Sequence, residues 1–404
     1  MSRDDNVTAR VSALPLGIGV VGAGRFATFV ADAVADLPEV ELRAVVDPDR
    51  AAATALAERH GGWVSPSLEE LLDDPDVDVV VVATPPATHA SLARLALESG
   101  RHVFCEKPLA TTAEDLACLV DYACTSDQVL LVDHVLRYNP ILRAVGRLQE
   151  TVLGPPQRFL FENDASDEDL HDEHWFWDEA VSGGIFVEHG VHFFDAATML
   201  VGRPVSTVQA SAARRTGTGL CDLVSATARH GDDVLATHTH SFTHAHRCER
   251  QLMRLDHGAA EVRVEGWIPV DATVDLWTDD AGAAACEALT AAVLEVDGFR
   301  LSPQAVVGVE VERDTSLPDA RGRGADLCVP HHVRIRLGLG GAAAKAEVYA
   351  ESVRAAMADL VRCAVTGARP RSGLAEGADA VSVALAASRA ASSGGTIHLS
   401  GDPT

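Results

Sequence analysis

A glycine-rich loop near the start of the chain constrains its fold more than any other feature. A short apolar run at residues 16–21 leads directly into Gly-Ala-Gly-Arg-Phe-Ala at residues 22–27, and helical periodicity follows. The first glycine of such a loop permits a tight turn, the second lets a diphosphate approach the backbone, and the final alanine lets helix and strand pack closely. The sequence therefore predicts a dinucleotide site of the Rossmann type. Its expected residues are Gly22, Gly24, Arg25, Phe26 and Ala27.

An acidic residue ends the next predicted strand. Residues 41–46 read as a strand and are followed by Asp47. A carboxylate in this place suits the 2′-hydroxyl of an adenosine ribose and repels a 2′-phosphate. We therefore expect NAD as the cofactor in preference to NADP.

Further strand patterns alternate with helical ones. Residues 77–83 are almost entirely valine, and residues 102–105 form another apolar run. Such runs are typical of strands covered on both faces, as in a parallel sheet flanked by helices. Ligands of these sheets bind at the carboxyl edge. The residues that follow the two strands at this edge are Thr84, Pro85, Glu106 and Lys107.

The composition argues against several kinds of partner. The formal net charge of −26 would repel nucleic acids and anionic membranes. No uninterrupted apolar run approaches the roughly 20 residues of a membrane span, and the polar first ten residues do not resemble a signal peptide.

Eight cysteines without a CxxC pair indicate neither a disulfide framework nor a zinc ribbon. We therefore expect a protein of the reducing cytoplasm.

Lysine is rare in this chain. Only Lys107 and Lys345 occur among 33 basic residues, and arginine supplies the rest. An ammonium ion and a guanidinium group are not interchangeable, because one is a compact charge and the other a planar fork. A lysine retained at the carboxyl edge of the sheet, where ligands bind, favours a specific role for the ammonium group of Lys107.

A second glycine-containing segment carries ionisable residues. Residues 182–195 begin with Ser-Gly-Gly and continue with helical spacing. Glu188, His192 and Asp195 stand at positions i, i+4 and i+7, which places them on one stripe of a helix. A carboxylate one turn from an imidazole can fix its tautomer, as a general base requires. The alternative is a half-buried helix whose polar stripe faces water.

An acidic segment precedes this helix. Residues 162–179 carry nine acids and no lysine or arginine, and they include Trp175 and Trp177. Indole rings stack on sugars, and carboxylates bind hydroxyl or ammonium groups. We therefore expect both tryptophans to contact substrate, and an aminosugar or aminocyclitol becomes a candidate. The alternative is a charged surface loop held by buried aromatic residues.

Several histidines are close together in the second half of the chain. Strand alternation places His238 and His240 on one face, with His244 and His246 nearby. No carboxylate or cysteine set accompanies them at the spacing of a metal site. We expect no metal, and we expect histidines that face an aqueous cleft.

Taken together, the motifs resemble the glucose-fructose oxidoreductase, inositol dehydrogenase and MocA (Gfo/Idh/MocA) family. The resemblance rests on the glycine loop, Ala-Thr-Pro-Pro, Glu-Lys-Pro, Arg-Tyr-Asn-Pro, and the Gly-Gly segment that ends at the helical stripe. It implies an α/β Rossmann domain over residues 1–139. An α+β domain with a large open, mostly antiparallel sheet would occupy residues 140–404, and its final helices would pack back on the first domain. A homodimer or homotetramer is also implied.

The resemblance further implies a catalytic group of Lys107, Glu188 and His192. His192 would take the proton of a substrate hydroxyl, and Lys107 would stabilise the charge on that oxygen. Glu188 would orient the histidine. Family members most often have aspartate here, and the longer side chain leaves a substrate contact open. Tyr138 and Asp195 complete the expected substrate contacts.

These observations predict an NAD-dependent oxidoreductase that transfers a hydride between nicotinamide and a secondary alcohol or ketone. The substrate would be a small polyol, such as a sugar, cyclitol or aminosugar. One alternative is an NAD-dependent enzyme of glycosidase type that oxidises its substrate only transiently. Others are an NADP-dependent ketone reductase and a cofactor-binding sensor without catalysis.

Overall fold

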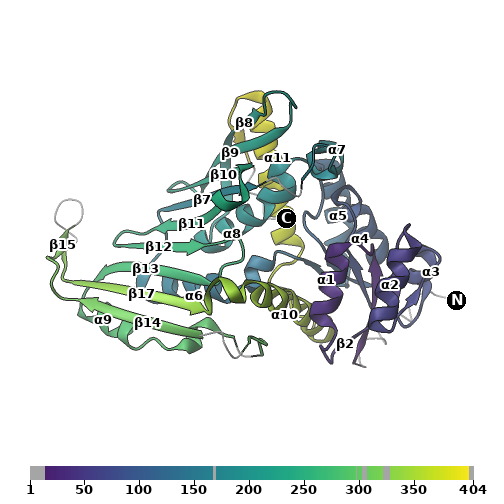
Figure 1. The fold of residues 1–404 in the computed structure, drawn as a ribbon, viewed down its shortest axis with the longest axis horizontal. Coiled ribbons are helices and arrows are strands. Elements are labelled where there is room, and N and C mark those ends of the chain that lie inside the picture. Colours follow the sequence, from purple (N-terminus) through teal and green to yellow (C-terminus); the bar gives the residue numbers. More distant parts are fainter. Residues whose placement is uncertain (1–13, 167–169, 297, 303–306, 322–327, 400–404) are drawn as a thin grey trace.

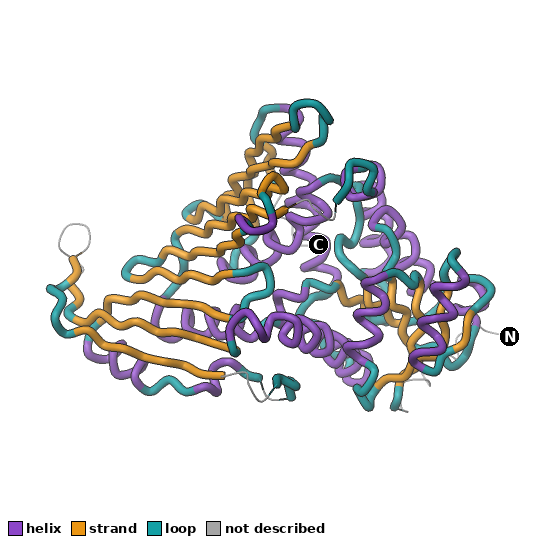
Figure 2. The backbone as a smooth tube through the Cα atoms, viewed as in Figure 1, coloured by secondary structure: helices purple, strands orange, loops and turns teal. Residues whose placement is uncertain are grey.

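The computed structural model describes residues 14–166, 170–296, 298–302, 307–321 and 328–399 (Figure 1). It contains two large sheets, each flanked by helices (Figure 2). The first sheet belongs to the N-terminal part of the chain and the second to the remainder. No helix among the described residues is long and apolar enough to cross a membrane.

The first sheet has six parallel strands in the order β3-β2-β1-β4-β5-β6. The order reverses beside β1, so the crevice outside the carboxyl ends of β1 and β4 is a topological switch point. The strands are β1 Leu16–Val21, β2 Val40–Val46, β3 Trp63–Val64, β4 Val79–Val82, β5 His102–Cys105 and β6 Leu130–Val132. The helices between them are α1 Arg25–Val34, α2 Arg50–His60, α3 Leu68–Asp73, α4 His89–Glu98 and α5 Ala113–Ala123.

Burial and capping explain these elements. Every residue of β4 and β5 is buried, as the apolar runs predict for strands covered on both faces. Side chains cap several helices: Asp49 accepts from the amides of Ala51 and Ala52 at the start of α2, and Thr112 accepts from Asp115 at the start of α5.

The second sheet has ten strands in the order β14-β17-β13-β12-β11-β7-β10-β9-β8-β18. Only the β7–β10 pair is parallel among its paired neighbours in the described chain. Its strands are β7 Arg158–Ser166, β8 Val205–Arg214, β9 Cys221–His230, β10 Val234–His244, β11 Arg250–Asp256, β12 Ala260–Glu265, β13 Asp271–Thr278, β14 Val307–Asp314, β17 His331–Leu339 and β18 Ile397–His398. Strands β15 Ala320–Arg321 and β16 Cys328–Val329 form a separate ribbon.

Helices of the second half pack on this sheet and on the first. They are α6 Pro140–Leu148, α7 Glu179–Ser182, α8 Val191–Val201, α9 Asp280–Glu287, α10 Lys345–Thr366 and α11 Leu374–Ser393. Phe193 of α8 stacks on Phe161 of β7 with ring centroids 3.6 Å apart. Tyr349 of α10 contacts Phe29 of α1 at 4.5 Å. Helix α11 packs on α8 of the second half and on α5 of the first. Helix α10 lies beside α1, as Figure 1 shows.

The predicted fold class is confirmed. The chain has an N-terminal Rossmann sheet and a second, mostly antiparallel sheet with helices. The domain boundary at residue 139 stays a prediction.

Candidate active site

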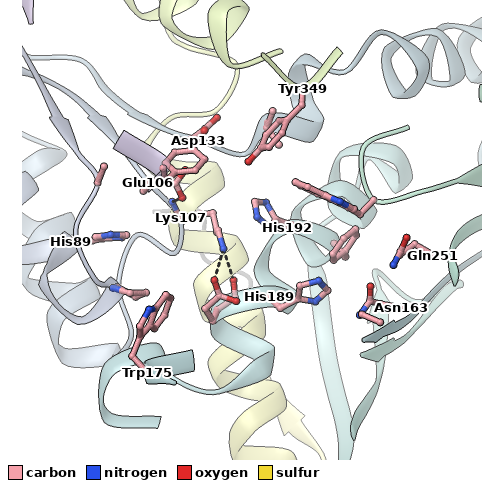
Figure 3. A pocket seen from close by; sticks show the side chains of 18 of the residues that line it. His89, Glu106, Lys107, Asp133, Asn163, Trp175, His189, His192, Gln251 and Tyr349 are labelled. Atoms are coloured by element: carbon pink, nitrogen blue, oxygen red, sulfur yellow. Dashed lines mark hydrogen bonds and ion pairs between the residues drawn. The ribbon is translucent and has the colours of Figure 1, made fainter. Parts of the chain in front are cut away.

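A cavity of about 470 Å³ opens at the carboxyl edge of the first sheet and faces the second (Figure 3). From the N-terminal half it is lined by Phe26, Ala83, Thr84, Pro86, His89, Glu106, Lys107, Asp133 and Val135. From the second half it is lined by Asn163, Ala165, Trp175, Glu188, His189, His192, Phe193, Glu249, Gln251, Trp267, Lys345 and Tyr349. The predicted catalytic residues therefore share one cavity.

The glycine loop has the geometry that its sequence predicts. Gly22 has a φ of 94°, and a β-carbon there would lie 2.4 Å from the carbonyl oxygen of Ala83. Only glycine fits this turn. At Gly24, by contrast, a β-carbon would meet nothing within 4 Å, so the space beside the backbone is open. Ala27 is buried at the helix–strand contact. The loop thus fits the approach of a diphosphate.

Asp47 closes the same loop from the end of β2. One of its oxygens accepts from the amide of Ala23 and the other from the amide of Asp49, both at 2.6 Å. These bonds fix the carboxylate beside the glycine turn, where the ribose of a dinucleotide is expected.

The predicted cofactor residues divide into two groups. Those that line the cavity are Phe26, Thr84, Glu106 and Lys107. Those outside its lining are Gly22, Gly24, Arg25, Ala27, Asp47 and Pro85.

Lys107 and Glu188 form an ion pair although they are 81 residues apart. The Lys107 ammonium donates to Glu188 Oε1 at 2.7 Å and to the Glu188 carbonyl at 3.0 Å. Burial alone would lower the pKa of Lys107, but the carboxylates of Glu188 and Glu106 outweigh it and raise that pKa. Lys107 therefore stays charged inside the cavity, where Figure 3 shows its side chain with dashed lines for the interactions of its ammonium group.

The partner of Glu188 differs from the prediction. Within the described chain its side chain pairs with Lys107 and makes no hydrogen bond to His192. The reason is local: Phe186–Gly190 forms a π-helical turn, and α8 begins only at Val191. A π-helical turn changes the angular spacing of side chains, so the expected stripe does not run continuously from Glu188 to His192.

His192 lies in the first turn of α8 and faces the cavity. Its buried Nδ1 has no hydrogen-bond partner among the described residues, and the ring meets that of His134 edge-on at 6.4 Å. Burial, and then the positive charge of Lys107, holds the pKa of His192 well below its usual value. The imidazole is therefore neutral at pH 7 and can accept a proton.

Glu106 and Asp133 form a buried acidic pair in the same cavity. They follow the neighbouring parallel strands β5 and β6 and lie close together in Figure 3. Burial raises the pKa of both carboxyl groups, and the charge of Asp133 raises the pKa of Glu106 further. Asp133 was absent from the predicted site. The rule that found Glu106 also identifies it, because Asp133 directly follows a strand.

Only one of the four predicted substrate contacts reaches the cavity. Trp175 lines it and is 41% exposed. The other three lie outside the lining, because each has a partner elsewhere. Tyr138 is buried and donates to Asp359 at 2.9 Å, Trp177 donates to the carbonyl of Leu170 at 3.1 Å, and the buried Asp195 accepts from Arg137 at 2.8 Å. The proposed substrate contact therefore rests on Trp175 and not on Tyr138, Trp177 or Asp195.

The carboxylates of the acidic segment do not line the cavity either, as far as that segment is described. Arg250 pairs with Glu162 and Asp164, and Asp178 caps α7. Residues 167–169 lie outside the described residues. Trp175 therefore remains a candidate substrate contact, while Glu162, Asp164 and Asp178 have partners outside the cavity.

Two of the strand histidines are core residues. His238 and His240 share a face of β10, as alternation predicts, but both are fully buried, so the expected aqueous cleft was wrong. His240 Nδ1 lies 3.0 Å from Nδ1 of His189, a cavity residue that the sequence reasoning missed. No group of three or more metal-ligating side chains occurs among the described residues.

Comparisons with known proteins agree with this architecture. Residues 16–134 match the model of the oxidoreductase family with an NAD-binding Rossmann fold, and residues 141–261 match the GFO/IDH/MocA C-terminal domain. Levoglucosan dehydrogenase in complex with NADH and levoglucosan has the same fold, with a TM-score of 0.73. It is 18% identical and is matched over 95% of this chain and 99% of its own.

Curated relatives match over part of their length. Inositol 2-dehydrogenase of Rhizobium meliloti is 30% identical over 210 residues, which cover 48% of this chain and 58% of that protein. D-xylose 1-dehydrogenase (NADP(+)) 2 of Haloferax volcanii is 29% identical over 171 residues, which cover 41% of this chain and 51% of that protein. The chain thus spans about half the length of these relatives. The two family models nevertheless cover more than half of the chain, which therefore belongs to the Gfo/Idh/MocA family of oxidoreductases.

Proposed function

We propose that this protein is a nicotinamide-dependent dehydrogenase that oxidises a secondary alcohol of a sugar or cyclitol. One observation carries the proposal: Lys107, Glu188 and His192 converge on one cavity beside the glycine loop. The relatives named above as inositol 2-dehydrogenase and levoglucosan dehydrogenase support this class of substrate.

The residues present fit NAD. The open space at Gly24 suits the diphosphate, and Asp47, fixed at the end of β2, suits the ribose 2′-hydroxyl. NAD, when bound, supplies the hydride acceptor. NADP is the second candidate, since one relative is named for it. The carboxylate of Asp47 makes it the weaker one, because a 2′-phosphate would meet a negative charge.

His192 and Lys107 divide the work on the substrate hydroxyl. Neutral His192 accepts the hydroxyl proton on its imidazole as the carbon–hydrogen bond breaks. Lys107 donates a hydrogen bond to the same oxygen and stabilises its developing negative charge. Glu188 acts through Lys107, because it holds the ammonium in place and keeps it charged.

A homodimer or homotetramer remains part of the proposal. The outer face of the second sheet carries paired charges, such as Arg334 with Asp275 and Arg336 with Glu312. A face with both signs of charge can complement a second copy of itself. Light scattering in solution, compared at low and high salt, tests this association. The cytoplasmic location stays a prediction.

The proposed activity is tested by following NADH formation at high pH. A panel of paired neutral, amino-substituted and acidic sugars and cyclitols is supplied with NAD, and NADP is run in parallel. We expect NADH from at least one polyol and a lower rate with NADP. Cleavage of a glycoside without net NADH would instead favour the glycosidase-type alternative. Tight NADH binding without turnover of any compound would favour the sensor.

A further inference from the structure

We propose that Lys345 forms a second binding point in this cavity and recognises an anionic group, a carboxylate or a phosphate, carried by the substrate. The inference rests on the proposed function and narrows its substrate class to acidic sugars or cyclitols. The chain has two lysines among 33 basic residues, and both line the same cavity.

Lys345 lacks the charge partner that Lys107 has. It is the first residue of α10, half-buried, with its ammonium 5.5 Å from the centre of the Trp267 ring. Among the described residues no carboxylate lies within ion-pair distance of it, and no hydrogen bond engages it. Burial lowers the pKa of Lys345, which Glu249 only partly offsets. An anion bound beside it would restore the interactions that burial removes.

The surroundings hold the beginning of α10 against the cavity. Tyr349 lies one helical turn after Lys345 in α10, and its ring centroid is 4.9 Å from that of Trp267. The ring of Tyr349 also contacts Phe29 of α1. This aromatic row joins α10 to the helix that follows the glycine loop. Lys345 is therefore positioned by packing on both halves of the molecule.

Neutral polar groups of the second sheet also line the cavity. Asn163 of β7 and Gln251 of β11 stand directly opposite each other in the sheet. Figure 3 shows these two amides together, across the cavity from Lys107. A ligand whose reacting hydroxyl lies at Lys107 would thus extend toward the amides of the second sheet, which can bind further oxygens.

Glu249 limits how the anion can lie. Its Oε1 accepts from the amide of Ser166 at 2.8 Å, which fixes the carboxylate at the cavity wall. A substrate anion must avoid this charge while it contacts Lys345, so hydroxyl groups of the ligand would face Glu249. This arrangement favours a ligand with one anionic end and several hydroxyls over a small free anion.

The scarcity of lysine allows a direct binding test. Reductive methylation with ¹³C-formaldehyde labels Lys107, Lys345 and the α-amino group, and dimethyl-lysine keeps its positive charge. The Lys345→Arg variant assigns the Lys345 signal. The NADH-loaded protein is titrated with D-glucuronate, D-gluconate and D-glucose 6-phosphate. D-glucose and myo-inositol serve as neutral partners, and potassium chloride keeps the ionic strength constant.

We expect a saturable shift of the Lys345 signal with at least one acidic ligand, and an affinity at least tenfold above that of its neutral partner. The proposal is overturned if no acid shifts this signal, or if neutral and acidic partners bind equally well. Binding of an acid without NADH formation from any compound would contradict the dehydrogenase instead. The two failures are therefore distinguishable.

Kinetics of two variants separate substrate from cofactor. Lys345→Met should raise KM for the acidic substrate at least tenfold and change kcat little, while Lys345→Arg should restore much of the loss. Arg389→Met removes an exposed charge from α11 and is the matched control. If Lys345→Met weakened NADH binding and left KM for the acid unchanged, the anion would be a phosphate of the cofactor, and the substrate assignment would be wrong.

Discussion

Lys107 owes its position and its charge to a residue 81 positions away. The ion pair with Glu188 keeps the ammonium protonated in a partly buried site, where an unpaired lysine tends to lose its proton. It also holds the ammonium in the cavity that His192 lines. The proposed reaction uses this charge at the substrate oxygen.

Substitution Lys107→Met should lower kcat by about 10²–10³-fold, because one donor to the developing oxyanion is lost. NADH affinity, followed by fluorescence titration, should stay within about threefold, since the glycine loop and Asp47 are unchanged. Glu188→Gln is the companion variant: it keeps the side-chain length and removes the charge that supports Lys107. Full turnover by Lys107→Met would contradict the assigned role.

The sequence predicted which residues lie in one site more reliably than it predicted which of them form hydrogen-bonded pairs. Lys107, Glu188 and His192 were all expected in one site, and they do share the cavity. The expected partner of Glu188 was wrong, because helical spacing assumed a regular helix. Asp133 was missed although it directly follows β6, and His189 was missed because it lies in the π-helical turn.

The glycine loop is the element that sequence predicted in most detail. Its strand, turn and helix all occur at the expected residues, since each step depends on local backbone geometry. The π-helical turn at Phe186–Gly190 is the contrary case. It lies in a densely packed place: a β-carbon at Gly190 would approach the Phe194 ring at 3.1 Å and His240 at 3.4 Å. This packing depends on residues that are far apart in the sequence, such as His240 of β10, so no local sequence pattern predicts the π-helical turn.

Two alanine substitutions separate the roles of the loop glycines. Gly22→Ala should destabilise the fold by about 1–3 kcal/mol in denaturant unfolding, because alanine must adopt a positive φ and would clash with the Ala83 carbonyl. Gly24→Ala should leave stability unchanged but weaken NADH binding by about tenfold, or about 1.4 kcal/mol. Its methyl group would occupy the space that suits a diphosphate. Equal effects of both variants on stability would contradict this division.

The arrangement of the whole molecule follows from the two sheets and the final helices between them. Residue patterns indicated the first sheet and the family resemblance implied the second, yet neither indicated the cavity wall formed by Trp267, Lys345 and Tyr349. Those residues are brought to the glycine loop by packing of α10 on α1. Contacts between such distant segments depend on how side chains fit together in three dimensions. Local sequence patterns do not predict them.

Buried neutral histidines should make the molecule acid-sensitive. Five histidines are at most 1% exposed, and burial lowers the pKa of each: His89, His134, His230, His238 and His240. In the unfolded chain their pKa returns to about 6.5. Below that pH the unfolded state binds more protons, so stability is complete above it and falls as the pH decreases.

His238→Leu isolates this effect. One histidine that stays neutral in the fold accounts for about 1.4 kcal/mol of the stability lost between pH 7.5 and 5.5, and the variant should lose that much less. Exposed His398→Leu is the control and should keep the wild-type pH dependence. The raised pKa values of Glu106 and Asp133 increase stability as the pH falls, opposite to the effect of the histidines. Both variants keep these two carboxyl groups, so their contribution cancels when the variants are compared. An unchanged pH dependence in His238→Leu would contradict this account.

Transfer of deuterium from substrate to cofactor is the most direct test of the proposed hydride chemistry. The fastest polyol of the panel, deuterated at its carbon-bound hydrogens, is converted with NAD, and both products are analysed by mass spectrometry. We predict one deuterium in the reduced cofactor for each ketone formed. Reduced cofactor without deuterium, or consumption of the polyol with neither ketone nor NADH, would contradict a dehydrogenase built on Lys107 and His192.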